Sequence, residues 1–293
     1  MNGIINIDKP LGFTSHDVVA KLRGILKIKK IGHTGTLDPD ASGVLPICVG
    51  NATKVADMLT ATDKEYVAEV TLGSKTDTQD ASGKVLATAE VAVTEDELKA
   101  AFSTFIGESL QIPPMFSAIK KDGKKLYELA RAGIEIEREP RPITIFEIEL
   151  LSADLENKKC TIRVACSKGT YIRTLCQDLG EKLGCFAHMS ALRRTKSGRF
   201  SIADAISLDE VEKRVKEEDF SFLQATDSVF AELPALYLSK RKAELVCHGV
   251  PVRTPGIIEG ATYRVYDETG RFLTISLATD GMLKILKTFY QNQ

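Results

Sequence analysis

The chain has 293 residues, of which 43% are apolar and 27% are charged, with a formal net charge of -1. These values are ordinary for a protein that folds around a large core, as one big domain or as one big and one small domain. The N-terminal MNGIINIDKP lacks the basic and apolar regions of a signal peptide, and no stretch is apolar over the roughly 20 residues that span a bilayer. We therefore expect a cytoplasmic protein.

The N-terminal elements are a short strand and a helix. The strand at 4–7 runs into the turn DKPLGFTS (8–15), where Thr14 or Ser15 can cap a helix. Asp17 would stand in the first turn of that helix, where a negative charge is favourable. Apolar side chains then recur at helical spacing, which predicts a helix with one buried face.

A glycine-studded stretch follows at 32–45, GHTGTLDPDASGVL. Pro39 disfavours the α region for Asp38, and three glycines interrupt the run, so neither a helix nor a regular strand is predicted. We expect a shaped loop that carries Asp38. An Asx turn, in which Asp38 bonds its own backbone, is the alternative interpretation.

Periodicity and breaker residues predict the other elements of the first 230 residues. Thr94 and Glu97 form a capping box, and two prolines keep 111–118 extended. Because the elements do not alternate as βαβ units, we expect an α+β fold in which helices flank a mixed, largely antiparallel sheet. The expected strands are 44–50, 66–73, 143–151 and 159–166, and the expected helices are 51–63 with Asn51 near its cap, 94–107, 126–133, the latter part of 167–184, and 208–218.

The composition changes after the last of these helices. A short helix is expected at 239–248, and YRVYDETGRFLTISL (263–277) has the pattern of a β-hairpin with a DETG turn. The segment 235–293 is therefore predicted to be a separate, mostly β module beside a main domain at 1–230.

Charge is unevenly distributed along the chain. The runs 21–30 and 193–199 carry five and four basic residues with no acid, and 120–125 carries four bases with one acid, whereas 204–219 holds seven acids and three bases. Three basic runs beside glycine-rich loops predict a surface that binds phosphates.

Cysteine and histidine spacing does not predict a metal site. No CxxC pair and no HExxH-type pattern occurs, so reduced, mostly buried thiols are expected. The residues concerned are Cys48, Cys160, Cys166, Cys176, Cys185 and Cys247, and His16, His33, His188 and His248.

Six sequence blocks, in this order and spacing, resemble the bacterial tRNA pseudouridine-55 synthases of the TruB type. With their connecting segments they cover nearly all of 4–210, and the last 60 residues are similar, less sharply, to the PUA-type RNA-binding module common in that family. The blocks are DKPLGFTS (8–15), GHTGTLDPDASGVL (32–45), KEYVAEVTLGSKTDTQDASGKV (64–85), QIPPMFSAIKKDGKKLYELARAG (111–133), SKGTYIRTLCQDLGEKLG (167–184) and ALRRTKSGRF (191–200).

The resemblance implies an isomerase that breaks the N1–C1′ bond of one uridine in the T loop of tRNA and rejoins the ring through C5. Asp38 aligns with the essential aspartate of the family, and Asp40 falls at a variable position without a role. Arg173 falls where the family has a basic partner of the aspartate. The positions that contact the flipped uridine are His33, Tyr66, Tyr171 and Leu192.

The resemblance also implies that the T arm of tRNA is the partner, with no metal or organic cofactor and no obligatory protein partner, for a chain that we expect to be a monomer. An insertion at about 108–142, with its KKDGKK run, is expected to clamp the T arm through phosphate contacts. The residues expected to bind RNA are Lys9, Lys120, Lys121, Lys124, Arg131 and Arg193.

The chemistry suits a carboxylate at Asp38. Three mechanisms remain open for this carboxylate. It can add to the uracil ring, bond to C1′ of the ribose, or promote loss of a ribose proton. Burial alone would favour its neutral form, and we expect Arg173 to offset this through a bidentate contact.

Base flipping explains the aromatic residues. Extruding a stacked base costs a few kcal/mol, and stacking on an aromatic ring returns roughly 1–3 kcal/mol, which suits Tyr66 and Tyr171. We expect Tyr66 also to take part in moving the C5 proton, although a phenol is a poor base. His33 is expected to occupy the space that the base leaves.

Three rival interpretations remain. Asp38-Pro39-Asp40 has the spacing of an aspartate-based phosphotransferase, although no hydrophobic strand precedes it directly. A non-enzymatic RNA-binding or RNA-chaperone module would explain the basic runs with Asp38 as a turn residue. An isomerase acting on another RNA is the third. Conversion of unmodified tRNA to pseudouridine distinguishes the first two from the enzyme.

Overall fold

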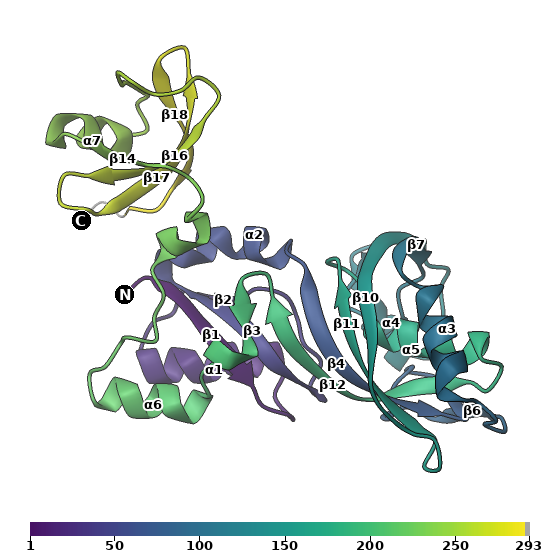
Figure 1. Ribbon diagram of the computed structural model, residues 1–293. Coiled ribbons are helices and arrows are strands. Elements are labelled where there is room, and N and C mark those ends of the chain that lie inside the picture. Colours follow the sequence, from purple (N-terminus) through teal and green to yellow (C-terminus); the bar gives the residue numbers. More distant parts are fainter. Residues whose placement is uncertain (291–293) are drawn as a thin grey trace.

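The computed structural model describes residues 1–290. Nine of its strands form one twisted sheet (Figure 1). These strands are β1 (Gly3–Lys9), β2 (Ile31–His33), β3 (Ala41–Val49), β4 (Lys64–Leu72), β7 (Gly107–Gln111), β10 (Arg141–Asp154), β11 (Lys159–Cys166), β12 (Ala187–Ser197) and β13 (Phe200–Ser201). They lie in the order β1-β3-β12-β4-β11-β10-β7, with β2 beside β3 and β13 beside β12. Every pair is antiparallel except β3 with β12, so the predicted mixed, largely antiparallel sheet is confirmed.

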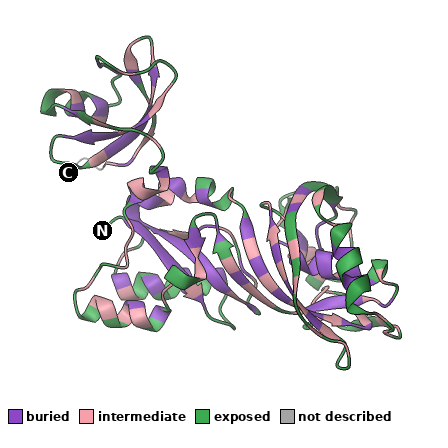
Figure 2. Cartoon of the chain, viewed as in Figure 1, coloured by how far each residue is buried: buried purple, intermediate pink, exposed green. Residues whose placement is uncertain are grey.

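Helices cover the two halves of this sheet. The helices and 3-10 turns up to residue 230 are α1 (Ser15–Leu26), η1 (Gly50–Val55), α2 (Ala56–Thr60), α3 (Glu95–Ser103), α4 (Leu126–Arg131), α5 (Ile172–Lys182), η2 (Ile202–Asp204), α6 (Leu208–Lys216) and η3 (Thr226–Phe230). One core lies between α1, α6 and strands β1 and β3, and another between α3, α5 and strands β4, β10 and β11. Figure 2 shows β1 and β3 buried along most of their length and the outer face of α3 exposed. Within residues 1–290, no helix has the length and apolar character needed to cross a bilayer.

The two halves meet where β3 and β12 run in parallel. Leu192 pairs with Ala41, and Arg194 pairs with Gly43. Gly43 has φ +106, and a Cβ there would come within 2.2 Å of the backbone oxygen of Arg194, so only glycine fits this close approach. The segment that enters β3 is therefore pressed against β12, which places the loop before β3 at the centre of the sheet.

The first helix shows how local signals determine an element. Thr14 is the N-cap of α1: its hydroxyl accepts a hydrogen bond from the Asp17 amide at 3.0 Å, and the Asp17 carboxylate accepts one from the Thr14 amide at 2.8 Å. This capping box satisfies two amides that the helix itself cannot bond. Of the two predicted caps, Thr14 is confirmed.

Four other features differ from the sequence predictions, either because their bounds differ or because they were not predicted. The irregular segment is only 34–40, because β2 and β3 pair with each other and extend into the predicted loop. The predicted helix 51–63 begins as the 3-10 turn η1 and ends at Thr60, and its proposed cap residue, Asn51, instead donates its side-chain amide to the Phe289 carbonyl at 2.7 Å. The turn-rich segment after β4 contains a small two-stranded sheet, and strand β12 was not predicted at all. The small sheet consists of β5 (Ser74–Thr76) and β6 (Val85–Thr88).

The C-terminal residues form the expected small β module. Its five-stranded sheet has the order β14-β16-β17-β18-β15, and one helix packs on it. The elements are β14 (Ala235–Leu238), α7 (Lys240–Cys247), β15 (Val252–Arg253), β16 (Thr262–Asp267), β17 (Phe272–Thr279) and β18 (Met282–Thr288).

This module is not structurally independent. Besides its own core, it contributes Phe289 and Ile275 to a cluster with Val55 and Phe230 of the preceding part of the chain. Lys54 of η1 also donates to the Thr288 carbonyl at 2.8 Å. Figure 1 shows the module beside the α2 end of the large sheet. Apolar side chains and hydrogen bonds therefore join this module to the preceding part of the chain.

Candidate active site

The loop at 34–40 is held by its neighbours and not by its own aspartate. The Ser15 hydroxyl accepts from the Leu37 amide at 2.9 Å and donates to the Leu37 carbonyl at 3.2 Å. The Pro39 carbonyl accepts from the Gly12 amide at 2.9 Å and from the Lys9 ammonium at 3.3 Å. These bonds fix the loop from outside, so the carboxylate of Asp38 does not have to stabilise the turn.

Asp38 presents its carboxylate to a buried arginine. One of its oxygens lies 3.1 Å from Nη2 of Arg173, and the side chain of Asp38 remains 44% exposed while that of Arg173 is 8% exposed. Within residues 1–290, the carboxylate of Asp38 accepts no hydrogen bond from a turn amide. The Asx-turn interpretation is therefore not supported, and the carboxylate is free toward the solvent side.

Arg173 binds two carboxylates, each through one nitrogen. Nη2 contacts Asp38 and donates to the Phe116 carbonyl at 2.9 Å, while Nη1 lies 3.4 Å from Oδ2 of Asp80. The expected bidentate contact with Asp38 is therefore not formed. The guanidinium is instead shared, which fixes its plane and directs Nη2 at the loop that carries Asp38.

Asp80 was missed by the sequence interpretation. Its Oδ1 accepts from the Thr78 hydroxyl at 2.6 Å and from the Ser82 amide at 3.0 Å, which leaves Oδ2 for Arg173. The signal was present in the block SKTDTQDASGKV, where an aspartate lies between turn-forming hydroxyl residues. In the sequence this block has the pattern of an ordinary turn, and only the fold brings Asp80 next to α5.

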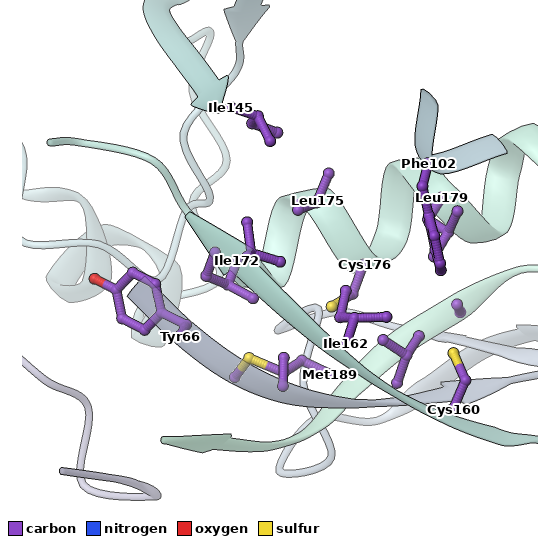
Figure 3. Close-up of a cluster of buried hydrophobic side chains, with 14 of the residues drawn as sticks. Tyr66, Phe102, Ile145, Cys160, Ile162, Ile172, Leu175, Cys176, Leu179 and Met189 are labelled. Atoms are coloured by element: carbon purple, nitrogen blue, oxygen red, sulfur yellow. The ribbon is translucent and has the colours of Figure 1, made fainter. Parts of the chain in front are cut away.

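Tyr66 and Leu192 lie on adjacent central strands. Tyr66 is in β4 and Leu192 is in β12, where it pairs with Ala68 of β4 and with Ala41 of β3. Figure 3 shows the Tyr66 ring at the edge of a buried cluster, with its hydroxyl pointing away from Ile172. Burial raises the pKa of Tyr66 above that of an ordinary phenol. Tyr66 is therefore protonated at neutral pH and is poorly suited to be a base.

Tyr171 is positioned at the start of α5. Its amide donates to the Gln111 side chain at 2.8 Å, and the amide group of Gln111 donates back to the Tyr171 carbonyl at 3.1 Å. The ring is half-buried, and burial raises the pKa of its phenol. The charges of Arg173 and Asp38 both act on its phenol, so Tyr171 lies near the same site.

His33 ends β2, one residue before the loop. Its ring lies edge-on to that of His16, with centroids 5.4 Å apart and an interplanar angle of 69°. Burial, assisted by the charges of His16 and Arg194, lowers the pKa of His33, so its ring is neutral at pH 7. Its Nδ1 is buried and, within residues 1–290, has no hydrogen-bond partner.

The residues expected to bind RNA are not all at the surface. Lys120, Lys121 and Lys124 are exposed on a two-stranded hairpin, and Arg131 is exposed at the end of α4. Arg193 is half-exposed and pairs with Asp8 at 2.8 Å. The hairpin consists of β8 (Lys120–Lys121) and β9 (Lys124–Lys125).

Lys9 differs from the other predicted RNA-binding residues, because it is fully buried. Its ammonium donates to the carbonyls of Pro10, Phe13 and Pro39. Lys9 therefore holds the turn after β1 against the Asp38 loop, and its charge is not presented to a phosphate. Sequence alone did not reveal this, since a lysine in a turn is usually exposed.

Lys9→Met is expected to change how stability depends on pH. Burial lowers the pKa of Lys9 from 10.5 to about 8, although the charges of Asp38 and Asp40 oppose the shift. Between those two pH values the unfolded chain binds more protons than the folded one, so the contribution of Lys9 to stability rises with pH. Urea unfolding of both proteins from pH 7 to 10 should show that the free energy of unfolding of the wild type rises relative to that of the variant. A constant difference would contradict this assignment.

Comparison with known proteins identifies the family. Residues 23–172 match the N-terminal domain of the TruB family pseudouridylate synthases, residues 173–231 match the tRNA pseudouridylate synthase B C-terminal domain, and residues 234–284 match the C-terminal part of pseudouridine synthase II TruB. The chain is 46% identical to the tRNA pseudouridine synthase B of Bacillus anthracis, over 100% of this chain and 99% of that protein. It is also 46% identical to the protein of that name from Stutzerimonas stutzeri, over 97% and 94%.

Solved structures agree with this assignment. A Cbf5-Nop10-Gar1 complex contains a chain that is 29% identical, with a TM-score of 0.71 over 98% of this chain and 85% of that one. An H/ACA RNP bound to a substrate RNA containing 2'-deoxyuridine gives a TM-score of 0.70 at 28% identity, over 99% and 85%. The likeness extends over the large sheet and the C-terminal module, and with the sequence matches it shows that this chain belongs to the TruB family of pseudouridylate synthases.

Proposed function

We propose that this enzyme converts the uridine at position 55, in the T loop of tRNA, to pseudouridine, with Asp38 as the essential group. The observation that supports this most directly is the Asp38–Arg173 contact. A carboxylate with one oxygen 3.1 Å from a buried guanidinium, and with its side chain 44% exposed, is oriented and accessible. The curated relatives, named tRNA pseudouridine synthase B, support tRNA as the substrate.

The reaction conserves atoms and electrons. The N1–C1′ bond breaks, the uracil turns, the C5–C1′ bond forms, C5 loses a proton and N1 gains one. No oxidant or reductant is required, so the side chains need only hold the base, stabilise charge and move protons. Asp38 supports cleavage and rejoining by attack on the ring, by attack on C1′ or by promoting loss of a ribose proton.

The flipped base has a defined set of proposed neighbours. Tyr66 and Tyr171 supply aromatic faces that offset lost stacking, and Leu192 supplies an apolar contact on the central strand. Tyr66 is protonated at neutral pH, and we therefore assign it to hydrogen bonding with the base in preference to proton abstraction from C5. Arg173 orients the carboxylate of Asp38.

Different parts of the chain have different proposed roles in binding the T arm. We propose that residues 1–230 form the catalytic domain, that its insertion at about 108–142 clamps the T arm, and that 235–293 is a PUA-like module. Lys120, Lys121, Lys124 and Arg131 are exposed on the insertion, where their charges can contact phosphates. Arg193 on β12, which is half-exposed, is the other charge proposed to contact a phosphate, whereas Lys9 is buried and leaves the proposed set. We expect the chain to act in the cytoplasm, as a monomer and without an obligatory protein partner.

A tritium-release assay tests the proposed function. Formation of the C5–C1′ bond expels the hydrogen on C5, so tRNA transcripts labelled with tritium at C5 of uridine should release one equivalent per molecule. A transcript with cytidine in place of the T-loop uridine, at position 55, is the control and should release none. Release from both transcripts would contradict the site, and release from neither would contradict the function.

His33→Ala is expected to weaken RNA binding more than chemistry. The neutral, half-buried ring next to the loop is suited to fill the space that an extruded base leaves. Loss of one stacking contact should raise the Kd for a T-arm hairpin by roughly tenfold, while the single-turnover rate at saturating enzyme falls less. Filter binding and rapid-quench kinetics give the two values. Equal Kd for variant and wild type would contradict the proposed role.

A further inference from the structure

Arg194 is a buried cation that the proposed mechanism does not yet use. It lies in β12 with 1% of its surface exposed, and within residues 1–290 it forms no ion pair with a carboxylate. Its neighbour Arg193, in contrast, is half-exposed and pairs with Asp8. A buried guanidinium that bonds only uncharged acceptors is costly. Its position therefore suggests a role beyond packing.

The guanidinium connects the two ends of the segment that carries Asp38. Its Nε donates to the Val44 carbonyl at 2.7 Å, and Nη2 donates to the Gly35 carbonyl at 3.4 Å. These carbonyls lie on either side of Asp38 in the sequence. The backbone of Arg194 is also in close contact with Gly43. Arg194 thus fixes both the entry and the exit of the loop against β12.

The same guanidinium acts on Tyr66. Arg194 and Tyr66 are cross-strand partners in the β12–β4 ladder. Burial raises the pKa of the Tyr66 phenol, and the charge of Arg194 partly offsets this rise. Directly opposite partners point to the same face of the sheet, and a cation beside a phenol favours its oxygen turned toward the charge and its proton turned away.

We propose that Arg194 is a positioning residue that holds the Asp38 loop and the Tyr66 hydroxyl in one fixed arrangement, with the Tyr66 proton directed at the substrate base. The inference rests on the proposed function, since it requires Asp38 and Tyr66 to act on a flipped uridine. A guanidinium suits this role because its planar fork donates in several fixed directions at once, whereas an ammonium is a point charge on a flexible stem.

A double-mutant cycle with Arg194→Met and Tyr66→Phe tests the coupling. Phenylalanine keeps the ring but removes the hydroxyl of the residue that pairs with Arg194 across the strands. Arg194→Met should lower the single-turnover rate of uridine conversion by about a hundredfold, while the Kd for a T-arm hairpin changes by less than about threefold. In the double variant the rate loss should be smaller than the product of the two single losses by at least about fivefold.

Arg194→Lys separates the effect of the charge from that of the guanidinium geometry. It is also the variant to use in the cycle if Arg194→Met does not fold. It keeps the charge but not the fork, so it should lose at least about tenfold in rate and show the same non-additivity with Tyr66→Phe. Arg163→Met is the matched control: Arg163 lies on β11 and bonds Glu65, Glu147 and Glu149 on the face of the sheet opposite Tyr66, and its loss should leave the rate unchanged.

The outcomes distinguish the inference from the function on which it rests. Wild-type enzyme that releases no tritium would overturn the proposed function. Active wild type with folded Arg194 variants of wild-type rate, or with rate losses that simply multiply in the double variant, would overturn the positioning role alone. Thermal melting of each variant shows which of them are folded.

Discussion

Asp38→Asn should abolish conversion of uridine while leaving RNA binding almost intact. Asparagine has the same shape but is neither a nucleophile nor a base, so the single-turnover rate should fall by at least about a thousandfold. The loop itself should persist, because Ser15, Lys9 and Gly12 hold its backbone and the carboxylate does not. Tritium release with enzyme in excess measures the rate, and filter binding measures the Kd, which should change by less than about threefold.

Asp40→Asn is the matched control for this substitution. Asp40 stands two residues further along the same loop and is exposed, and within residues 1–290 it forms no ion pair with Arg173. Its variant should keep most of the wild-type rate. Should Asp38→Asn retain a tenth of the wild-type rate, or should both variants lose activity equally, the specific role of the Asp38 carboxylate would be refuted.

Arg173→Lys is expected to have the second largest effect. The guanidinium reaches Asp38 at 3.1 Å with one nitrogen and Asp80 at 3.4 Å with the other, while it also donates to the Phe116 carbonyl at 2.9 Å. A lysine ammonium cannot make these three contacts in one plane. The positioned charge beside Asp38 would be lost, and the single-turnover rate should fall by about a hundredfold or more.

Asp80→Asn shows whether the sharing of Arg173 matters. It removes one of the two carboxylates but leaves the direct contact with Asp38, so the expected loss is about tenfold, between wild type and Arg173→Lys. Arg163→Met again serves as the control, because it removes an arginine that binds carboxylates away from the site. If Arg173→Lys matched the control in rate, Asp38 would not need the planar guanidinium as its partner.

Two buried cations, Lys9 and Arg194, hold the backbone of the Asp38 loop. Lys9 holds the Pro39 carbonyl on one side, and Arg194 holds the Gly35 and Val44 carbonyls on the other. Both would ordinarily be expected at the surface. Their cost in desolvation is offset by fixing the backbone that carries Asp38, which is the kind of preorganisation that catalysis requires.

Local signals in the sequence were enough for several elements. The Thr94–Glu97 capping box begins a helix as predicted, and Thr14 is the cap of the first helix out of the two residues predicted for it. Both are hydrogen-bonding patterns within one turn. The strand beginning near Tyr66 was predicted from alternation, and it starts two residues earlier, at Lys64. These features depend only on residues that are neighbours in the chain, so the sequence specifies them without the tertiary structure.

Strand β12 shows where local signals failed. Its residues include RRTK, which has the charge pattern of an exposed run, yet Arg194 is buried because the strand is inserted between β3 and β4. Asp80 is a second case, since its side chain is a turn residue locally and a partner of Arg173 only in the fold. In both cases the role depends on residues about a hundred or more positions away.

The sequence by itself determined the largely antiparallel α+β fold, the likeness to the TruB family, and the choice of Asp38, Arg173 and Tyr66 as site candidates. Only the tertiary structure decided which charged side chains are buried. It buried Lys9 and Arg194, divided Arg173 between two carboxylates and joined the C-terminal module to the main core. The physical reason is that burial and ion pairing are properties of the assembled neighbourhood, in which residues from distant segments exclude water together, whereas capping and periodicity act within a few residues along the chain.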